Sequence, residues 1–281
     1  MCNSGFLLVD KEEGVTSRFV DNKIGFLFGT KRVGHLGTLD PFATGLLLVA
    51  VNKATKFLPY VEDDRKTYEA TLLLGAKTDS GDKDGQIVEE MPIPPLSEET
   101  IGRVFDSFLG KQKQLPPLRS AIKVNGKPLY KYAIEGKEVA IKEREVFIHF
   151  LALQSFDGPS IRFEATVSKG TYIRSLGEDI ASALGSVGHL TSLRRLRDGD
   201  VSVLKAKRLS EISKQDLLDP ASFVSLPSFD LGSSEWEKVK NGGKIHLDLS
   251  CDKVLLRYEG KAMFVYRKCG EGLYEAERGL F

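Results

Sequence analysis

The chain has 281 residues, of which 41% are hydrophobic and 28% charged, and its formal net charge is +1. This is the composition of a globular protein, and the length favours one large domain with an appendage or two domains. The longest uninterrupted apolar stretch, residues 46–51, is too short to cross a bilayer, and the N-terminus does not read as a secretory signal. We therefore expect a cytoplasmic protein without a membrane span.

The first fifth of the chain predicts a strand, a helix and a second strand. Residues 5–10 read as a short apolar strand. A helix follows, with Thr16 or Ser17 as its N-cap and with apolar residues at helical spacing up to Gly29. A glycine-rich loop then leads into the apolar strand at residues 46–51.

The middle of the chain alternates strands and helices. Residues 68–74 predict a strand, followed by an acidic loop at residues 78–85. Ser97 opens a capping box for a helix that continues through Phe108. Residues 119–145 read as an insertion with a basic helix at residues 129–135.

Strand periodicity returns at residues 161–167, and residues 175–184 predict a helix. Near residues 219–230 the helical pattern gives way to Pro, Ser and Asp, which indicates a domain boundary. The tail beyond it predicts a short helix at residues 236–239 and strands at residues 253–258 and 262–267.

Cysteines and histidines are too scattered to predict zinc or disulfides. The cysteines at positions 2, 251 and 269 form no Cys-x-x-Cys pair, and the four histidines are far apart. The acidic loop imitates a calcium loop but has Met91 where the bidentate Glu belongs. Residues 25–31 differ from a P-loop because three residues, not four, separate the glycines. We therefore predict no metal.

The near-zero net charge conceals segregation along the chain. Residues 62–99 hold eleven acidic against four basic residues, whereas residues 119–145 hold seven basic against four acidic ones, and residues 186–208 six against two. The basic segments predict a face that follows phosphates while the acidic stretch points to solvent. The alternative is that these runs are merely solvated surface.

One carboxylate, Asp40, stands where we expect chemistry. It lies in a tight loop punctuated by Gly34, Gly37 and Gly45, which permit backbone angles and close approaches that larger residues forbid. The strand that follows can hold the carboxylate still. The alternative is an Asp-Pro turn that only reverses the chain.

The whole loop resembles the signature loop of the TruB family of tRNA pseudouridine synthases, through His35, Thr38, Asp40, Pro41, Ala43, Thr44 and Gly45. Four further motifs follow the family's order, at residues 9–17, 66–68, 169–176 and 193–195. Residues 120–133 resemble the insertion with which the bacterial branch grips the T-arm of tRNA.

This resemblance implies a stand-alone, cofactor-free isomerase that converts a uridine in the tRNA T-loop, normally position 55, to pseudouridine. It implies an α+β fold with a mixed, largely antiparallel central sheet and flanking helices. The catalytic domain would span residues 1–229, and residues 230–281 would form a small β-rich domain similar to a PUA domain. We expect a monomer whose partner is tRNA.

The resemblance also assigns roles to individual residues. Asp40 would be the nucleophile, attacking C6 of the uracil or C1′ of the ribose, or driving glycal formation. Arg174 would pair with Asp40 and keep it ionised. Tyr68 and Leu193 would sandwich the flipped base, and Tyr68 is also a candidate for the base that removes the C5 proton.

Further residues are expected around the substrate. His35 would occupy the space left by the flipped base or support an unpaired nucleotide, although a histidine in a turn more often bonds to backbone. Tyr172 would hydrogen-bond near the pocket, and Lys11 would support the site from behind. The candidates for contact with RNA are Lys123, Lys127, Lys131, Arg194 and Arg195.

Two other functions compete with this interpretation. The chain could be the catalytic subunit of a guide-RNA-dependent pseudouridylase, whose members share the Asp loop. It could also be a non-catalytic protein that folds RNA by opening the T-loop. The bacterial-type insertion disfavours the first, and the intact Asp40, Tyr68 and Arg174 disfavour the second.

Overall fold

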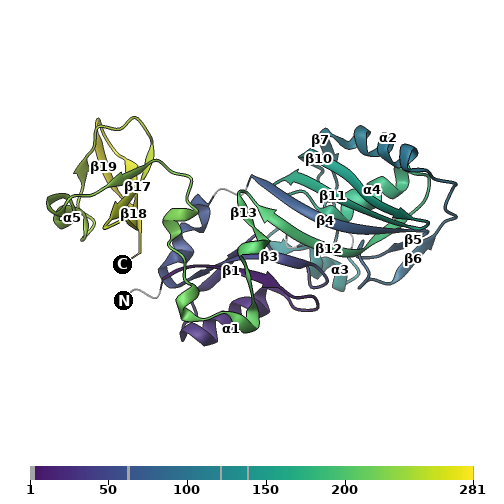
Figure 1. The fold of residues 1–281 in the computed structure, drawn as a ribbon, viewed down its shortest axis with the longest axis horizontal. Helices are drawn as coiled ribbons and strands as arrows, with labels where there is room; N and C mark the ends of the chain where they lie inside the picture. The colour runs from purple at the N-terminus through teal and green to yellow at the C-terminus, as the bar shows by residue number, and fades with distance from the viewer. Residues whose placement is uncertain (1–3, 62–63, 121, 138, 281) are drawn as a thin grey trace. The chain divides into compact units, whose positions relative to one another are not determined.

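The computed structural model describes residues 4–61, 64–120, 122–137 and 139–280. The chain divides into two compact units, and each is described by itself (Figure 1). The first unit consists of Met1–Asp40, Leu47–Glu62 and Lys205–Phe281, and the central unit of Pro41–Leu46 and Asp63–Leu204. The chain therefore first passes from one unit to the other directly after Asp40.

The N-terminal part of the first unit is a small sheet covered by one helix. Its elements are β1 (Gly5–Lys11), α1 (Ser17–Phe28), β2 (Val33–Leu36), the larger part of β3 (Thr44–Val51), a 3-10 segment (Asn52–Tyr60) and β14 (Lys207–Arg208). β1 pairs in parallel with β14, and β2 pairs antiparallel with β3. The apolar face of α1 closes one core with β1 and β3, formed by Leu7, Val9, Val20, Ile24, Phe28, Leu47, Val49, Val51 and Ile212.

The ends of α1 confirm the prediction for this helix. The Thr16 hydroxyl accepts a hydrogen bond from the Phe19 N–H, so Thr16 is the N-cap. Gly29 ends the helix in the left-handed conformation, with φ of 64°, which glycine adopts at little cost. Residues 25–31 therefore form a helix C-terminus, whereas a P-loop lies at a helix N-terminus.

Residues from 228 onward carry a sheet and a core of their own. The elements are β15 (Ser228–Asp230), α5 (Ser233–Val239), β16 (Ile245–His246), β17 (Lys253–Tyr258), β18 (Lys261–Lys268) and β19 (Leu273–Gly279). The sheet order is β15-β17-β18-β19-β16. Trp236 stacks on Tyr258 with ring centroids 4.6 Å apart, so the short helix is fixed on the sheet. The predicted β-rich tail is confirmed.

Short 3-10 segments connect these parts, at Val203–Lys205, Leu209–Glu211, Lys214–Asp216 and Pro220–Ser222. The last of them lies in the stretch of residues 219–230 where the helical pattern of the sequence fades.

The central unit is built on a long sheet in the order β3-β12-β4-β11-β10-β7. Its elements are β4 (Arg65–Leu74), β5 (Ala76–Thr78), β6 (Ile87–Glu90), α2 (Glu98–Phe108), β7 (Gly110–Gln114), β8 (Lys123–Val124), β9 (Lys127–Pro128), α3 (Leu129–Ile134), β10 (Arg144–Asp157), β11 (Ser160–Ser168), α4 (Ile173–Ala183), β12 (Gly188–Asp198) and β13 (Val201–Ser202). The pairs from β12 to β7 are antiparallel, and the first residues of β3 pair in parallel with β12.

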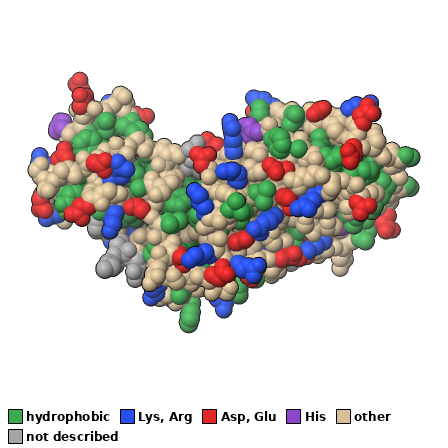
Figure 2. Space-filling view, in the orientation of Figure 1, with side chains coloured by type: hydrophobic (Ala, Val, Ile, Leu, Met, Phe, Trp, Pro, Cys, Tyr) green, Lys and Arg blue, Asp and Glu red, His purple; other side chains and the backbone are tan. Residues whose placement is uncertain are grey.

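Helices α2 and α4 pack on one face of this sheet (Figure 1). Gly177 on α4 explains the close approach, because a Cβ there would lie 2.9 Å from Leu190 and 3.6 Å from Leu72. On the face of the molecule in Figure 2, Lys and Arg side chains lie among Asp and Glu side chains rather than in one basic patch. The expected α+β fold with a mixed, largely antiparallel sheet is confirmed.

No helix among the described residues is long and apolar enough to cross a membrane.

Candidate active site

Asp40 is held in a loop that is anchored to α1. Ser17, at the start of α1, donates to the Leu39 carbonyl at 3.0 Å and accepts from the Leu39 N–H at 2.9 Å. Ser17 and Leu39 are buried, whereas Asp40 itself is half-buried. The residue before the carboxylate is thus fixed by two buried hydrogen bonds, which restricts where Asp40 can lie.

On the other side of Asp40, the loop enters the central unit through Gly45. This residue has φ of 101°, and a Cβ on it would lie 2.3 Å from the Arg195 carbonyl oxygen. Only glycine permits this approach of β3 to β12. Gly45, five residues after Asp40, thus permits a close approach within the sheet.

His35 is fixed by side chains rather than by backbone groups. Its Nδ1 lies 3.0 Å from Asp21 Oδ2, and its Nε2 lies 3.1 Å from Thr38 Oγ1. Asp21 is buried, and the His35 side chain is 16% exposed. The ring therefore connects α1 to the loop two residues before Asp40.

Arg174 lies near the start of α4 and is buried, with 3% of its side chain exposed. Its Nη1 donates to the Ser80 carbonyl at 2.7 Å and lies 3.6 Å from Asp82 Oδ2, and its Nη2 donates to the Arg119 carbonyl at 3.0 Å. These groups hold the guanidinium in a fixed orientation, as a positioning partner for an ionised carboxylate requires.

The acidic loop is not wholly directed to solvent, so that part of the charge prediction is wrong. Asp82 is 5% exposed, and its Oδ1 accepts from the Ser80 hydroxyl at 2.6 Å and from the Asp84 N–H at 3.1 Å. Since Asp82 also lies beside Arg174, a buried positive charge draws this carboxylate inward. A charge count along the sequence cannot detect that pairing.

Two residues that the sequence analysis missed hold the start of α4. Gln114, which is buried, donates from Nε2 to the Tyr172 carbonyl at 3.0 Å and accepts from the Tyr172 N–H at 2.8 Å. Ser175 donates to the Leu115 carbonyl at 2.9 Å. Together they fix the backbone on both sides of Arg174. In the sequence, the only indication is that Gln114 is polar and is the last residue of strand β7.

Tyr68 and Leu193 lie on one face of the central sheet. Tyr68 pairs with Arg195 on the neighbouring strand, and Leu193 pairs with Ala70. Leu72, two residues further along β4, lies beside Gly177, so this is the face that α4 covers. Tyr68 and Leu193 are 8% and 6% exposed.

A β-bulge brings Leu193 to this face. The register between β12 and β4 shifts between Leu190 and Ser192, so that Leu190 and Leu193 both face α4 although they are three positions apart. A strict period of two would place them on opposite faces. The sequence alone does not reveal the bulge.

Two lysines of the motifs are buried. Lys11 donates from Nζ to the carbonyls of Val15 at 2.7 Å and Glu12 at 2.9 Å, which fits a supporting role behind the site. Lys66, two residues before Tyr68, forms an ion pair of 2.9 Å with Asp198, and their side chains are 8% and 6% exposed. The sequence analysis gave Lys66 no role.

The residues expected to contact RNA divide into two groups. Lys123 and Lys131 are exposed, and Lys127 bonds to Glu135 and lies over the Tyr132 ring. Arg194 is half-buried. Arg195 is 1% exposed, and its Nε donates to the Leu46 carbonyl at 2.7 Å, so it joins β12 to β3 and is not a surface cation.

Among the described residues, no group of three or more His, Cys, Asp or Glu side chains is arranged to hold a metal ion. Within the first unit, the loop of Asp40 is fixed at Leu39. Within the central unit, Arg174 is buried, and Tyr68 and Leu193 share one face of the sheet.

Solved structures define the class of fold. The chain aligns with one in a Cbf5-Nop10-Gar1 complex, with a TM-score of 0.72 and 23% identity over 99% of this chain and 85% of that one. It aligns with one in an H/ACA RNP bound to a substrate RNA containing 2′-deoxyuridine, with a TM-score of 0.73 and 20% identity over 100% and 86%. At these identities the likeness establishes the fold.

Sequence comparisons define the family. The model of the TruB family pseudouridylate synthase N-terminal domain matches residues 26–173. A tRNA pseudouridine synthase B of Hydrogenovibrio crunogenus is 39% identical over 98% of this chain and 91% of its own length. Proteins of the same name from Oenococcus oeni and Francisella tularensis subsp. novicida are 38% and 44% identical, over 99% and 87% of this chain and 98% and 85% of their own lengths. The chain belongs to the TruB family of pseudouridine synthases, and the resemblance of its motifs is confirmed.

Proposed function

We propose that this enzyme isomerises a uridine of tRNA, in the T-loop at position 55, to pseudouridine, as a stand-alone catalyst without a cofactor. The observation that carries the proposal is an intact signature loop with Asp40 fixed at Leu39, in a chain that matches bacterial tRNA pseudouridine synthases B over nearly its whole length.

Asp40 acts as the nucleophile in this proposal. Attack at C6 or at C1′, or glycal formation, needs an ionised carboxylate that does not move, which the Ser17 anchor favours. Arg174 orients Asp40 and keeps it ionised, since its guanidinium is itself held by two carbonyls and Asp82.

The flipped base lies between Tyr68 and Leu193. Both are nearly buried side chains on the α4 face of the sheet, so they present an apolar and aromatic surface on which a base can stack. Tyr68 is also the candidate for the base that removes the C5 proton after the C–C bond forms. His35 and Tyr172 lie beside the bound RNA, and Lys11 supports the loop.

The RNA backbone lies along the basic residues of the insertion. Lys123, Lys127, Lys131 and Arg194 are the candidates for phosphate contacts, and binding is accordingly salt-sensitive. Arg195 positions the strands instead, because it is buried.

The proposed organisation is a catalytic domain at residues 1–229 and a small β-rich domain, similar to a PUA domain, at residues 230–281. The separate core around Val239, Val254 and Tyr266 supports an independent C-terminal domain. The chain acts as a monomer in the cytoplasm, where tRNA is processed.

Tritium release tests this proposal. An unmodified tRNA transcript carrying tritium at uridine C5 is incubated with the protein without ATP, metal or partner. We expect one tritium released per tRNA by the wild type, none by Asp40→Asn, and full release by Asp157→Asn, which alters an exposed carboxylate. Tight binding without release by the wild type would instead support a guide-dependent or non-catalytic role.

A further inference from the structure

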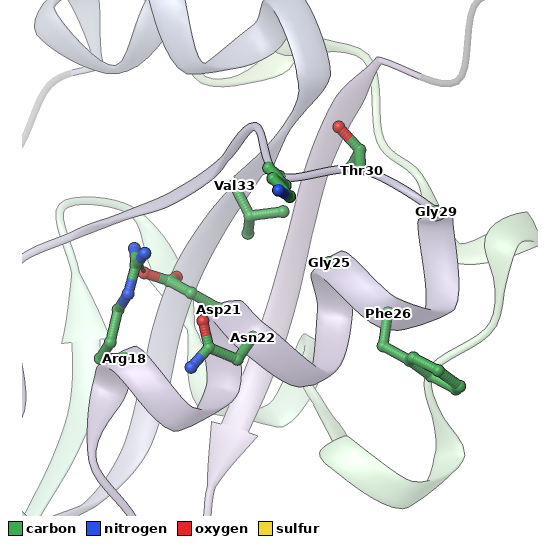
Figure 3. Close-up of a pocket in the computed structure, with 9 residues that line it drawn as sticks. Arg18, Asp21, Asn22, Gly25, Phe26, Gly29, Thr30 and Val33 are labelled. Carbon is green, nitrogen blue, oxygen red and sulfur yellow. Dashed lines mark ion pairs between the residues drawn. The ribbon is translucent and has the colours of Figure 1, made fainter.

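An open hollow lies beside α1, outside the residues assigned to catalysis (Figure 3). It has a volume of about 540 Å³. One wall is formed by side chains on one face of α1, and the other by the segment that follows the helix. The lining residues are Arg18, Asp21, Asn22, Gly25, Phe26, Gly29, Thr30, Lys31 and Val33.

One residue that lines the hollow, Asp21, has a buried carboxylate oxygen that lacks a hydrogen-bond partner among the described residues. Asp21 is 3% exposed; its Oδ2 lies 3.0 Å from His35 Nδ1 and 3.5 Å from Arg18 Nη1, whereas its Oδ1 has no partner among the described residues. An unpaired buried carboxylate oxygen is costly, so a donor from a ligand would be favourable there. In Figure 3, Arg18 and Asn22 stand on the same wall as Asp21.

The floor of the hollow favours N–H donors rather than phosphates. Asp21, in the first half of α1, brings a carboxylate to the hollow, and the C-terminal end of the helix, where the helix dipole is negative, borders the hollow at Gly29. Cations stand at the rim and nearby, at Arg18, Lys23, Lys31 and Arg32. The hollow thus offers hydrogen-bond acceptors at its floor and positively charged side chains around it.

The rim also offers an aromatic surface. Phe26 is 90% exposed, and its ring points away from the helix (Figure 3). A base of single-stranded or looped RNA stacks on such rings, while basic residues hold its phosphates. A lone exposed phenylalanine needs no explanation, but here it lines the same hollow as Asp21, Arg18 and Lys31.

We propose that this hollow binds an unpaired nucleobase of the tRNA substrate, one that carries an exocyclic amino group and is therefore not the target uridine. The amino group donates to Asp21 Oδ1, the base or its neighbour stacks on Phe26, and Arg18 and Lys31 contact phosphates. The inference rests on the proposed function for its tRNA ligand.

The site would communicate with the catalytic loop through one histidine. Asp21 bonds to His35, and His35 contacts Thr38, two residues before Asp40. A base bound at Asp21 Oδ1 therefore stabilises the carboxylate that fixes His35, and so favours one arrangement of the signature loop.

Photocrosslinking locates the ligand without requiring turnover. The photoreactive residue p-benzoylphenylalanine is placed at position 26 in the Asp40→Asn protein, and the tRNA transcript is irradiated and mapped by primer extension. Position 19 is the matched control, because Phe19 is an exposed phenylalanine of the same helix that does not line the hollow. We expect a crosslink at one unpaired nucleotide from position 26 only. No crosslink, or equal crosslinks from both positions, would overturn the proposal.

Affinity then tests the role of Asp21. In filter binding, Phe26→Ala is expected to raise the Kd for tRNA about five-fold or more, and Phe19→Ala to leave it unchanged. A tRNA whose crosslinked base lacks its amino group should bind the wild-type protein more weakly than the unaltered tRNA does. The Asp21→Asn protein, whose side chain still accepts a hydrogen bond from His35, should bind the two tRNAs equally well. Equal losses in both proteins would overturn the assignment of Asp21 Oδ1. If the crosslink and the affinity changes are found but the wild-type protein releases no tritium, only the proposed catalytic function is contradicted.

Discussion

The buried ion pair between Lys66 and Asp198 makes a strong prediction about stability. The two residues face each other on β4 and β12, their charged atoms are 2.9 Å apart, and both side chains are more than 90% buried. Asp198→Ala removes the carboxylate that is paired with the buried Lys66 ammonium. We expect a loss of about 3–5 kcal/mol in the free energy of unfolding, and a fall of about 6–20 °C in Tm.

The expected loss arises from burial, so an exposed pair is the proper control. Lys111 and Glu145 are 3.0 Å apart on the same sheet, but their side chains are 71% and 69% exposed. Lys111→Ala should change stability by at most about 1 kcal/mol. The double variant Lys66→Met with Asp198→Leu should recover most of the loss, because an apolar pair removes the desolvation penalty.

Thermal and urea unfolding, followed by circular dichroism, measure these changes. If Asp198→Ala and Lys111→Ala lost the same small amount, burial would not determine the value of these ion pairs. Tritium release measured well below each Tm adds a second readout. Because Lys66 precedes Tyr68 by two residues on β4, we expect Asp198→Ala to lower kcat as well.

Three further predictions concern single contacts. Asp82→Asn removes the carboxylate beside Arg174 and should lower the kcat of tritium release about 10–100-fold while tRNA binding is kept. Gln114→Ala breaks both bonds to the Tyr172 backbone and should cost about 1–3 kcal/mol in urea unfolding. Hydrogen bonds from the Lys207 side chain and from the Ser213 N–H lower the pKa of Asp216 to about 2. Its stabilisation is therefore present above about pH 4 and lost as the pH falls through 2, so the Tm difference between wild type and Asp216→Asn should vanish over that range.

Local signals in the sequence predicted the helices well. The N-cap of α1 at Thr16 and that of α2 at Ser97 both accept the expected backbone bonds, and Gly29 ends α1. Such signals act over a few residues, so a sequence displays them completely. The loop of Asp40 was recognisable for the same reason, since all its residues are contiguous.

Features that depend on distant residues were missed. The strand β10 was not predicted, because its exposed Phe147 and Phe150 interrupt the alternation of apolar and polar residues. The bulge in β12 and the burial of Arg195 were missed as well, since both arise from pairing with β4 and β3. Register between strands far apart in the sequence leaves no local pattern.

Several of the buried charged residues fix a short segment in or beside one of the sequence motifs. Lys11 binds the turn after β1, Asp82 and Arg174 connect the acidic loop to α4, and Arg195 ties β12 to β3. Buried charges are a poor means of adding stability, because desolvation offsets most of their attraction. They instead restrict the orientation of the groups that they join, since a charge-assisted hydrogen bond permits few alternative geometries. The mechanism proposed for Asp40 needs a carboxylate that is held still while a base is extruded from RNA, which would be a reason to retain them.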